Sequence, residues 1–371
     1  MSSAHQYAFL EKITELYKPY ESRFDDVYIL ACQHVLEPQA KMFELIADFG
    51  MPRENIRIFG KIYSTSNEVV DELLRDEFKV SEPVFDPTVS FDVKHHEICK
   101  KELIEFLAPI KTPSKIIVLD DGGELLKIVN DSFEAVSALA PIFGVEQTSS
   151  GFRKLEHAQL HFPIYNVARS SIKLIKESPL IAELGCGRIV DVVDQYRIAD
   201  PRFLVVGLGP LGANTLSILE DKGYYALGYD IAGQERSELI DLIRDNQINI
   251  VVGVTGTNII DEEQLQKLVA ASDQPLYLIS MSSADREFPA TYIRQHGVAP
   301  AGIHSDVVWN NLVLINNGFP ITFKGKRYES TPAEIERTIG LLYGSTLEAM
   351  AKGEQARMGF VDVPAEVENL L

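Results

Sequence analysis

The sequence has few cysteines, no long apolar run and a shortage of basic residues. The three cysteines of the 371-residue chain, Cys32, Cys99 and Cys186, are scattered along it and odd in number. They indicate neither a disulfide framework nor a metal cluster, and they fit a reducing compartment. No apolar run approaches the length of a membrane span, and residues 1–17 lack the basic-then-apolar pattern of a signal peptide. We therefore expect a cytoplasmic protein without a metal site.

The charge balance argues against two classes of partner. The chain has 35 lysines and arginines against 54 aspartates and glutamates, which gives a formal net charge of −19. Nucleic acids and anionic membranes would repel such a chain, because no basic cluster offsets the charge. The apolar fraction of 46% and the charged fraction of 24% are typical of a soluble globular protein, and the length suits two domains. We expect a small-molecule substrate, with neither nucleic acid nor membrane as partner.

Residues 203–230 have the form of a dinucleotide-binding βαβ unit. A short apolar run enters a glycine-rich turn, an amphipathic helix pattern follows, and a second strand ends on Asp230. Gly207 suits the tight turn, Gly209 lets the backbone approach a pyrophosphate, and Gly212 allows close packing of helix and strand. The free N–H groups of the helix N-terminus would face the phosphates. The cofactor contacts predicted for this turn are Gly207, Gly209, Pro210, Leu211 and Gly212.

Asp230 indicates which dinucleotide this unit binds. It lies eighteen residues past Gly212. A carboxylate there accepts hydrogen bonds from both ribose hydroxyls and repels a 2′-phosphate, which favours NAD over NADP. The alternative is a Rossmann-like unit that binds no nucleotide. Strand, turn, helix, strand and terminal acid occur in register, and this order predicts NAD as the cofactor.

Short strands and helices alternate along the chain, which predicts an α/β protein with parallel, doubly wound sheets. We expect two open domains of this kind, one of them a Rossmann NAD-binding domain, with the active site in a cleft between them. Residues 1–180 and 328–371 form the predicted substrate and catalytic domain, and residues 185–327 form the predicted NAD-binding domain.

Two further elements are predicted towards the end of the chain. Residues 311–316 and 319–323, joined by Asn-Asn-Gly, are predicted to pair as a hairpin that closes the second sheet. Residues 332–351 carry apolar positions on one stripe, which predicts a helix that packs back on the first domain.

Polar groups follow three strands of the first domain: His34, Asp120-Asp121 and the segment 146–150. Ligands bind at the carboxyl ends of strands in such sheets, so this grouping indicates a site. Each group also has a structural alternative: a hydrogen bond to a neighbouring loop for His34, an ordinary turn for the two aspartates, and a solvated loop for the segment. The hydroxyl donors that the segment would offer to a cofactor are Thr148, Ser149 and Ser150.

Lys173 and Glu177 are four residues apart in a predicted helix. This spacing favours a surface ion pair of little energetic weight. The alternative is a proton-transfer couple, which requires that the start of the helix lines the active site.

The order of these motifs resembles that of S-adenosylhomocysteine hydrolase over nearly the whole chain, up to about residue 350. The resemblance includes the nucleotide fingerprint and Lys173. Its other motifs are Cys32-Gln-His34, Tyr63-Ser-Thr-Ser66, Leu119-Asp-Asp-Gly-Gly-Glu-Leu125, Gly144-Val-Glu-Gln-Thr-Ser-Ser-Gly151, Pro163-Ile-Tyr-Asn-Val167, Val254-Thr-Gly256 and Ser283-Ala-Asp-Arg-Glu287.

The resemblance implies a redox cycle on bound NAD. In that family NAD takes hydride from the 3′-hydroxyl of the substrate ribose, the ketone acidifies the neighbouring C–H, a thiol is eliminated, water adds, and hydride returns. By position, Asp121 would be the acid/base near the sugar, Lys173 would help to deprotonate the hydroxyl, and His34 would act in elimination and addition. Glu177 and Ser178 replace an aspartate–asparagine pair of that family, so a catalytic role for Glu177 is expected only as the partner of Lys173. The cofactor contacts that it implies are Thr148, Ser149 and Ser150 at the nicotinamide, Asp230 at the adenosine ribose, and Thr255 and Gly256.

The chain departs from that family where the substrate is recognised. The family's glutamate before its threonine triplet is Gln147, an asparagine before the Ser-Thr pair is Lys61, and a histidine of its Gly-His-Phe-Asp motif is Ser283. Two residues that help to define adenine recognition fall on Leu36 and Pro38. A polar pocket discriminates strongly through unmet hydrogen bonds, so tight adenosine binding should be lost. Lys61, Gln147 and Ser283 are the predicted substrate contacts.

The sequence therefore predicts an NAD-dependent enzyme that oxidises a secondary hydroxyl of a sugar- or nucleoside-like substrate, with elimination or addition as an optional second half. The alternatives are a simple alcohol dehydrogenase that releases NADH and a catalytically inactive NAD-binding scaffold. The resembling family assembles as tetramers, and a homodimer or homotetramer is expected here.

Overall fold

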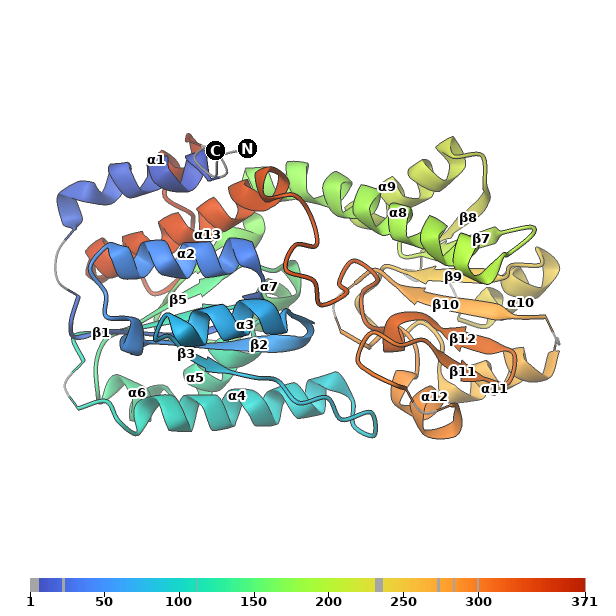
Figure 1. Cartoon of the computed structure of the whole chain (residues 1–371), viewed down its shortest axis with the longest axis horizontal. Helices are drawn as coiled ribbons and strands as arrows, with labels where there is room; N and C mark the ends of the chain where they lie inside the picture. The colour runs from blue at the N-terminus through green and yellow to red at the C-terminus, as the bar shows by residue number, and fades with distance from the viewer. Residues whose placement is uncertain are drawn as a thin grey trace. The chain divides into compact units, whose positions relative to one another are not determined.

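The computed structural model describes residues 7–21, 24–111, 113–230, 236–271, 274–282, 284–298 and 300–370. These residues form two compact α/β units (Figure 1). Unit 1 comprises Met1–Val84, His95–Glu177 and Gly325–Leu371, and unit 2 comprises Phe85–Lys94 and Ser178–Lys324. Among the described residues, no helix is both long and apolar enough to cross a bilayer.

Unit 1 is built on a sheet whose neighbouring strands run parallel, in the order β13-β6-β5-β4-β1-β2-β3 across the described residues. Its strands are β1 (Val27–Val35), β2 (Ile56–Thr65), β3 (Lys79–Ser81), β4 (Lys115–Asp120), β5 (Ile142–Glu146), β6 (Pro163–Asn166) and β13 (Gly359–Val361). The order 3-2-1-4-5-6 is that of a doubly wound fold, whose topological switch point lies between β1 and β4. Both faces of the sheet are covered, so strands such as β4 carry continuous apolar runs.

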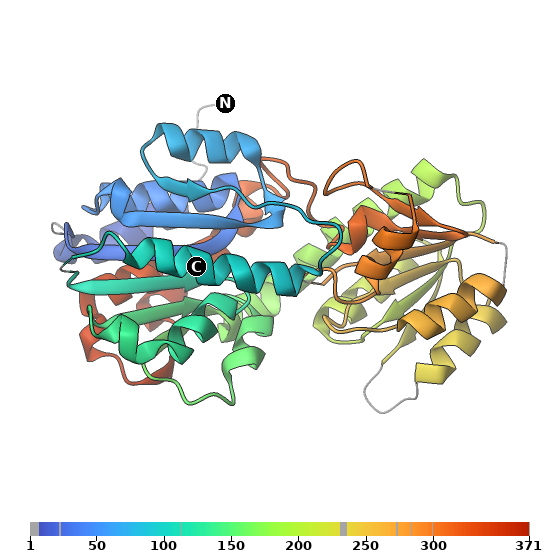
Figure 2. The same cartoon turned by 90° about the horizontal axis from the view of Figure 1, so that it is seen from below.

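Helices cover both faces of this sheet (Figures 1 and 2). One face packs against α1 (Ala8–Tyr17), α2 (Glu37–Asp48), α3 (Asn67–Arg75) and α13 (Pro332–Lys352). The other packs against α4 (Phe91–Leu107), α5 (Glu124–Asp131), α6 (Phe133–Ser137) and α7 (Ser149–Leu155). The prediction for residues 332–351 is confirmed, because α13 lies against α1 and α2. A capping box of Thr331 and Glu334 begins this helix.

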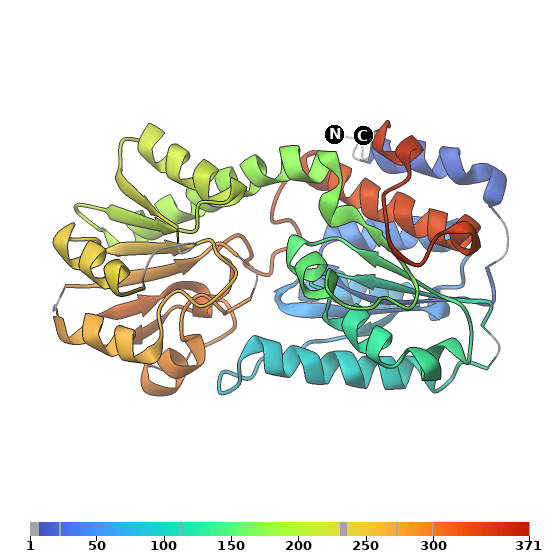
Figure 3. The ribbon, with the colours of Figure 1, turned by 180° about the vertical axis from the view of Figure 1, so that it is seen from behind.

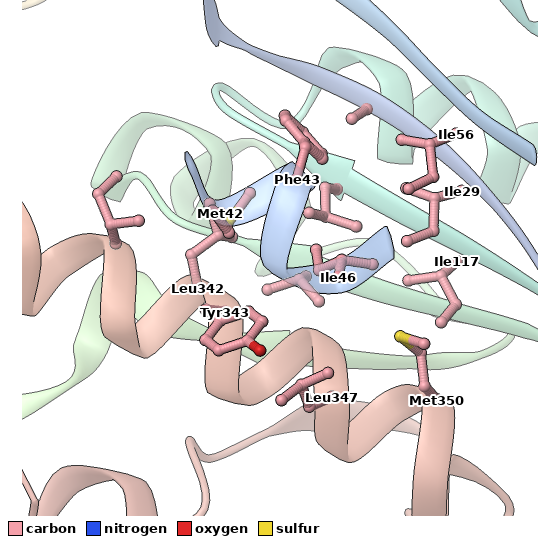
Figure 4. Packing of buried hydrophobic residues seen from close by; sticks show 14 of the residues in the cluster. Ile29, Met42, Phe43, Ile46, Ile56, Ile117, Leu342, Tyr343, Leu347 and Met350 are labelled. Atoms are coloured by element: carbon pink, nitrogen blue, oxygen red, sulfur yellow. The ribbon is translucent and has the colours of Figure 1, made fainter. Parts of the chain in front are cut away.

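The core of unit 1 lies between the sheet and the α2–α13 layer, where isoleucines of three strands meet side chains of the two helices (Figure 4). The residues labelled there are Ile29, Met42, Phe43, Ile46, Ile56, Ile117, Leu342, Tyr343, Leu347 and Met350. All are nearly or completely buried. Each fully buried large apolar side chain contributes about 1.5–3 kcal/mol of transfer free energy, so this layer is a main source of the stability of unit 1.

Unit 2 has the strand order β11-β12-β10-β9-β7-β8 across the described residues, with β11 antiparallel and the other pairs parallel. Its strands are β7 (Arg202–Val206), β8 (Tyr225–Tyr229), β9 (Ile250–Gly253), β10 (Leu276–Ser280), β11 (Val307–Trp309) and β12 (Leu312–Leu314). One face carries α8 (Ser178–Tyr196) and α9 (Pro210–Asp221), and the other carries α10 (Arg236–Asp245), α11 (Glu262–Ala271) and α12 (Ala290–His296) (Figure 3). The predicted fold class, two doubly wound parallel-sheet domains, is confirmed.

The hairpin predicted at the end of unit 2 is wrong. The antiparallel partner of β12 is β11, which precedes it, and residues 319–323 form no strand in the described chain. Asn310 adopts a left-handed φ of 54° in the short connection between β11 and β12. The Asn-Asn-Gly sequence instead lies in a 3₁₀ segment, Ile315–Gly318, in which Asn316 and Asn317 have φ values of 53° and 55°.

Candidate active site

Four predicted site residues converge at the carboxyl edge of the unit 1 sheet. His34 lies in β1, Lys61 in β2, Asp121 directly after β4 and Gln147 directly after β5. Adjacent parallel strands end at the same edge, and this is the switch point at which such sheets bind ligands. The β1–β2 register shifts around His34, an irregularity of the kind that re-aims side chains near active sites. We call these four residues the Asp121 centre.

Asp121 is the common acceptor of this centre. Its Oδ1 accepts a hydrogen bond from Lys61 Nζ, and its Oδ2 accepts one from Gln147 Nε2. His34 Nε2 lies 3.2 Å from the same Oδ2, and His34 Nδ1 lies 2.5 Å from Ser64 Oγ. An ionised carboxylate can only accept, so the proton of the neutral imidazole belongs on Nε2. Nδ1 is then the basic nitrogen, and the Ser64 hydroxyl donates to it.

Lys61 and Asp121 form an ion pair that is almost completely buried. Burial disfavours both charges, but their mutual attraction outweighs it and raises the pKa of Lys61. For Asp121, Lys61 and then His34 overcome burial and hold its pKa well below the usual range. Asp121 is therefore a stable carboxylate that fixes the orientation of its three donors.

Two further carboxyl groups, Asp120 and Glu146, lie fully buried beside the centre. Asp120 Oδ2 accepts the Leu126 N–H at 2.9 Å, while Glu146 Oε1 accepts the Thr148 N–H at 2.8 Å and the Gly122 N–H at 3.2 Å. Burial raises the pKa of Asp120 to about 6. Burial and then Asp120 raise the pKa of Glu146 to about 8. Glu146 thus joins the loops that follow β4 and β5 through these hydrogen bonds, and the sequence did not predict this role.

Glycines make this close packing of loops possible. A Cβ at Gly151 would lie 2.2 Å from the Glu146 carboxyl carbon. Gly123, with φ +72°, packs so tightly that its Cβ would lie 2.7 Å from Gly151 Cα. Contact between the two loops therefore explains Gly123 and Gly151, and Gly122 is explained by its φ of +113°.

The hydroxyl segment after β5 begins α7. Thr148 Oγ1 accepts the Gly151 N–H at 2.9 Å as the N-cap and donates to Glu146 Oε1 at 2.6 Å. Ser149 is exposed and Ser150 is half-buried in the first turn. Contact of these three hydroxyls with a nicotinamide stays a prediction.

Lys173 and Glu177 form a local ion pair, with Lys173 Nζ 3.0 Å from Glu177 Oε2. Their side chains are only 10% and 15% exposed, so most of the pair is shielded from solvent, and its role in proton transfer stays a prediction. The pair spans a π-helical turn, Lys173–Glu177, that follows β6 at the carboxyl edge of the sheet. Single π turns occur frequently at functional sites. The three donors to Asp121 described above do not include Lys173.

The glycine-rich turn of unit 2 has the geometry expected of a pyrophosphate site. Gly207 follows β7 with φ +100°, and Gly209 is the N-cap of α9, which begins at Pro210. A Cβ at Gly212 would lie 1.8 Å from the Gly207 carbonyl oxygen, so only glycine fits there. No described atom lies within 4 Å of a Cβ built on Gly209, so the backbone is open to a ligand at that point. Leu211 is half-buried in the first turn.

The predicted contacts Thr255 and Gly256 follow β9, next to this turn in the sheet order. Their backbone N–H groups donate to Oε1 of the buried Glu287 at 2.5 and 3.1 Å, and Ser280 Oγ donates to its Oε2 at 2.6 Å. Burial raises the pKa of Glu287. Glu287 belongs to the motif Ser283-Ala-Asp-Arg-Glu287, but its role in closing the ends of β9 and β10 was not predicted. Cofactor contact by Thr255 and Gly256 stays a prediction.

Asp230 directly follows β8 and is exposed. This is the position at which a carboxylate meets the adenosine ribose in dinucleotide-binding units. The predicted substrate contact Ser283 lies outside the described residues.

Comparisons with known proteins give relatives of low sequence identity. No family model matches the sequence. Two proteins of Mycobacterium tuberculosis, "Uncharacterized protein MT0113" from strain CDC 1551 and "Uncharacterized protein Rv0104" from strain H37Rv, are each 29% identical over 346 residues. The match covers 89% of this chain and 65% of each relative. The chain therefore spans slightly less than two thirds of the length of these relatives.

Solved structures share still less of the sequence. A dipicolinate synthase chain from Bacillus halodurans is 11% identical, with 89% of this chain and 99% of that chain covered and a TM-score of 0.41. The NAD-complexed D-isomer specific 2-hydroxyacid dehydrogenase from Lactobacillus delbrueckii ssp. bulgaricus is 12% identical, with 88% and 97% covered and a TM-score of 0.32. Neither of these is an S-adenosylhomocysteine hydrolase. Sequence identities and TM-scores this low do not indicate the function of this chain.

Proposed function

We propose that this chain is an NAD-dependent enzyme that oxidises a secondary hydroxyl of a sugar- or nucleoside-like substrate, by the redox chemistry of the S-adenosylhomocysteine hydrolase family that it resembles. The Asp121 centre carries this proposal. It places a histidine, oriented by a buried and ion-paired carboxylate, at the ligand-binding edge of a doubly wound sheet.

The residues of unit 2 fit NAD. The turn from Gly207 to Gly212 would hold the pyrophosphate at the start of α9, because the backbone is open at Gly209 and closely packed at Gly212. Asp230 would accept the hydroxyls of the adenosine ribose and disfavour a 2′-phosphate. When bound, NAD supplies the hydride acceptor.

Removal of hydride from a secondary alcohol also requires that the hydroxyl proton be taken up. The resemblance gives this step to Lys173 and gives elimination and addition to His34. His34 suits the proton uptake as well, because Asp121 holds its Nε2–H and leaves Nδ1 basic. The Ser64 hydroxyl, which donates to Nδ1, would pass its proton to the imidazole and take up the proton of a substrate hydroxyl. Lys173, to which the resemblance gives a part in this step, pairs with Glu177, and the low exposure of both side chains supports the proton-transfer couple that their spacing allows.

The substrate should differ from adenosine. Leu36 and Pro38 are buried apolar residues at the start of α2, where the resembling family has groups that hydrogen-bond adenine. Lys61 and Gln147 donate to Asp121 and would set the polarity of the pocket at the sugar. Together with Ser283 they are the proposed substrate contacts, and elimination or addition at the ketone would follow the oxidation.

The test uses the full-length protein, mass spectrometry of co-purified ligands, and a panel of sugar and nucleoside alcohols with NAD. Free NADH that accumulates would identify a simple dehydrogenase, whereas at most one equivalent of NADH per chain would identify internal recycling. Asp121→Asn should abolish either signal, and Asp131→Asn, an exposed aspartate of α5, is the matched control. Turnover by Asp121→Asn at the wild-type rate would refute the assignment, and no NADH with any alcohol would favour an inactive scaffold.

A further inference from the structure

We propose that Cys32, His95 and Cys99 form a binding site for one thiophilic divalent cation of the Zn²⁺ type in unit 1. Cys32 comes from β1, and His95 and Cys99 come from α4. Their Sγ and Nε2 atoms all lie within 4.8 Å of one another. None of the three ligands is a proposed redox residue, and the proposal does not depend on NAD chemistry.

The distances between the ligand atoms suit tetrahedral coordination. His95 Nε2 lies 3.7 Å from Cys32 Sγ and 3.6 Å from Cys99 Sγ. Zinc binds sulfur at about 2.3 Å and imidazole nitrogen at about 2.0–2.1 Å, which places tetrahedral sulfur and nitrogen ligands about 3.6 Å apart. A cation therefore fits this S–N–S arrangement without a change in the sulfur-to-nitrogen separations.

Local structure explains why these three residues meet. His95 and Cys99 are four residues apart in α4 and lie on one face of the helix. Cys32 belongs to the same buried cluster as Cys99, on the sheet face that α4 covers (Figure 1). No local sequence pattern indicates this cluster, because 63 residues separate Cys32 from His95.

Burial makes this set of ligands more specific. Both cysteines are fully buried and His95 is 6% exposed. Two thiols and an imidazole are soft donors, a set that selects Zn²⁺ or Cu⁺ over the hard cations Mg²⁺ and Ca²⁺. A coordinated cation deprotonates both thiols and balances the resulting charge, which an empty apolar site would not do.

The buried carboxyl group of Asp120 independently indicates that a positive charge would be favourable near Cys32. Asp120 is the register partner of Cys32 on β4, and its Oδ1 is buried without a hydrogen-bond partner among the described residues. Asp120 and Val118 point to the same face because they are two residues apart, and Val118 belongs to the cluster of Cys32. A cation in the site would give this oxygen a favourable electrostatic neighbour.

The structural consequence would be a fixed attachment of α4 to the sheet. The cation would join β1 to α4, two elements that otherwise meet here through apolar packing. Because the cation binds the folded chain, zinc should raise the midpoint of thermal unfolding of metal-free protein.

The decisive experiment is Co²⁺ substitution in metal-free, reduced, full-length protein. We expect tetrahedral d–d bands and a thiolate-to-cobalt charge-transfer band at one Co²⁺ per chain, both displaced by Zn²⁺. Cys186→Ser is the matched control, because Cys186 is the remaining cysteine and is buried in α8 of unit 2. Cys186→Ser should keep both bands, and this would assign the thiolate ligands to Cys32 and Cys99.

Cys32→Ser, Cys99→Ser and His95→Gln should each weaken the affinity for zinc by more than the roughly 10–100-fold that outer-shell changes cost. Circular dichroism of the metal-free variants checks their folding. Absence of the charge-transfer band from the wild-type protein overturns the proposal whether or not a variant folds. The proposal is also overturned if the charge-transfer band is lost in Cys186→Ser but retained in Cys32→Ser.

Discussion

Glu146→Gln removes one ionisable group beside the Asp121 centre and nearly preserves its shape. Glu146 is fully buried, and its Oε1 accepts N–H groups of Gly122 and Thr148. A glutamine oxygen can accept the same hydrogen bonds. The remaining atom, Oε2, has no hydrogen-bond partner among the described residues, so the amide nitrogen should cost about 1–3 kcal/mol at every pH.

The ionisation of Glu146 has a larger effect, and this effect depends on pH. Burial, and then Asp120, raises the pKa of Glu146 from 4.5 to about 8. The neutral carboxyl therefore favours folding, and this contribution is complete below about pH 4.5 and is lost as the pH rises through about 8. At about 1.4 kcal/mol for each pKa unit, the gap from 4.5 to about 8 corresponds to about 5 kcal/mol.

Urea unfolding followed by circular dichroism, between about pH 5 and about pH 9, measures this contribution. The free energy of unfolding of the wild-type protein should fall with pH relative to that of Glu146→Gln, and the difference between them should change by about 4 kcal/mol. Glu134→Gln, at an exposed position of α6, is the matched control and should follow the wild-type profile. Parallel profiles for the wild-type protein and Glu146→Gln would show that Glu146 ionises freely in the folded state, and would refute the reasoning.

Three further predictions concern the Asp121 centre and the glycine-rich turn of unit 2. Lys61→Met should lower the free energy of unfolding at neutral pH by about 3–5 kcal/mol in urea titrations, because it leaves Asp121 buried without its ammonium partner. Gly212→Ala should weaken NAD binding by about tenfold or more in a fluorescence titration, because its Cβ would meet a backbone oxygen at 1.8 Å; Gly187→Ala, in open space, should not. Gln147→Glu should cost about 1–3 kcal/mol at neutral pH in the same urea assay, and less in acid, because it sets a carboxylate against Asp121 in place of a donor.

The parts of the site that could be predicted depend on regular geometry. Apolar runs such as residues 116–119 and 203–206 identify buried parallel strands, and parallel strands end at a common edge. The convergence of His34, Asp121 and Gln147 follows from that rule and from the strand order. The glycine spacing of the unit 2 turn likewise fits its local conformation, because Gly207 has a positive φ, Gly212 packs against the Gly207 carbonyl oxygen, and Gly209 leaves the backbone open.

The parts that could not be predicted depend on side-chain contacts between distant segments. Lys61 is sixty residues from Asp121, and nothing in the sequence indicates that its ammonium turns inward to this carboxylate. Glu287 bonds to the loop at Thr255 from 32 residues away, which no local pattern reveals. The hairpin was predicted at Asn-Asn-Gly because that sequence permits a tight turn, but Asn310 permits one as well, and pairing with β12 decided between them.

Two departures from the resembling family, Lys61 and Gln147, change the charge of the Asp121 centre in the same direction. The resembling family has an asparagine and a glutamate where this chain has Lys61 and Gln147, so each replacement adds one unit of positive charge relative to that family. Both new side chains donate directly to Asp121, which shows that they act on one carboxylate and not at separate places. Lys61, Asp121 and Gln147 together carry no net charge, because Asp121 is ionised and Lys61 balances it. The same three positions in the resembling family, an asparagine, an aspartate and a glutamate, would carry two negative charges. A pocket at this edge would therefore repel an anionic substrate less, so substrate panels for this chain should include phosphorylated and carboxylated sugars beside neutral nucleosides.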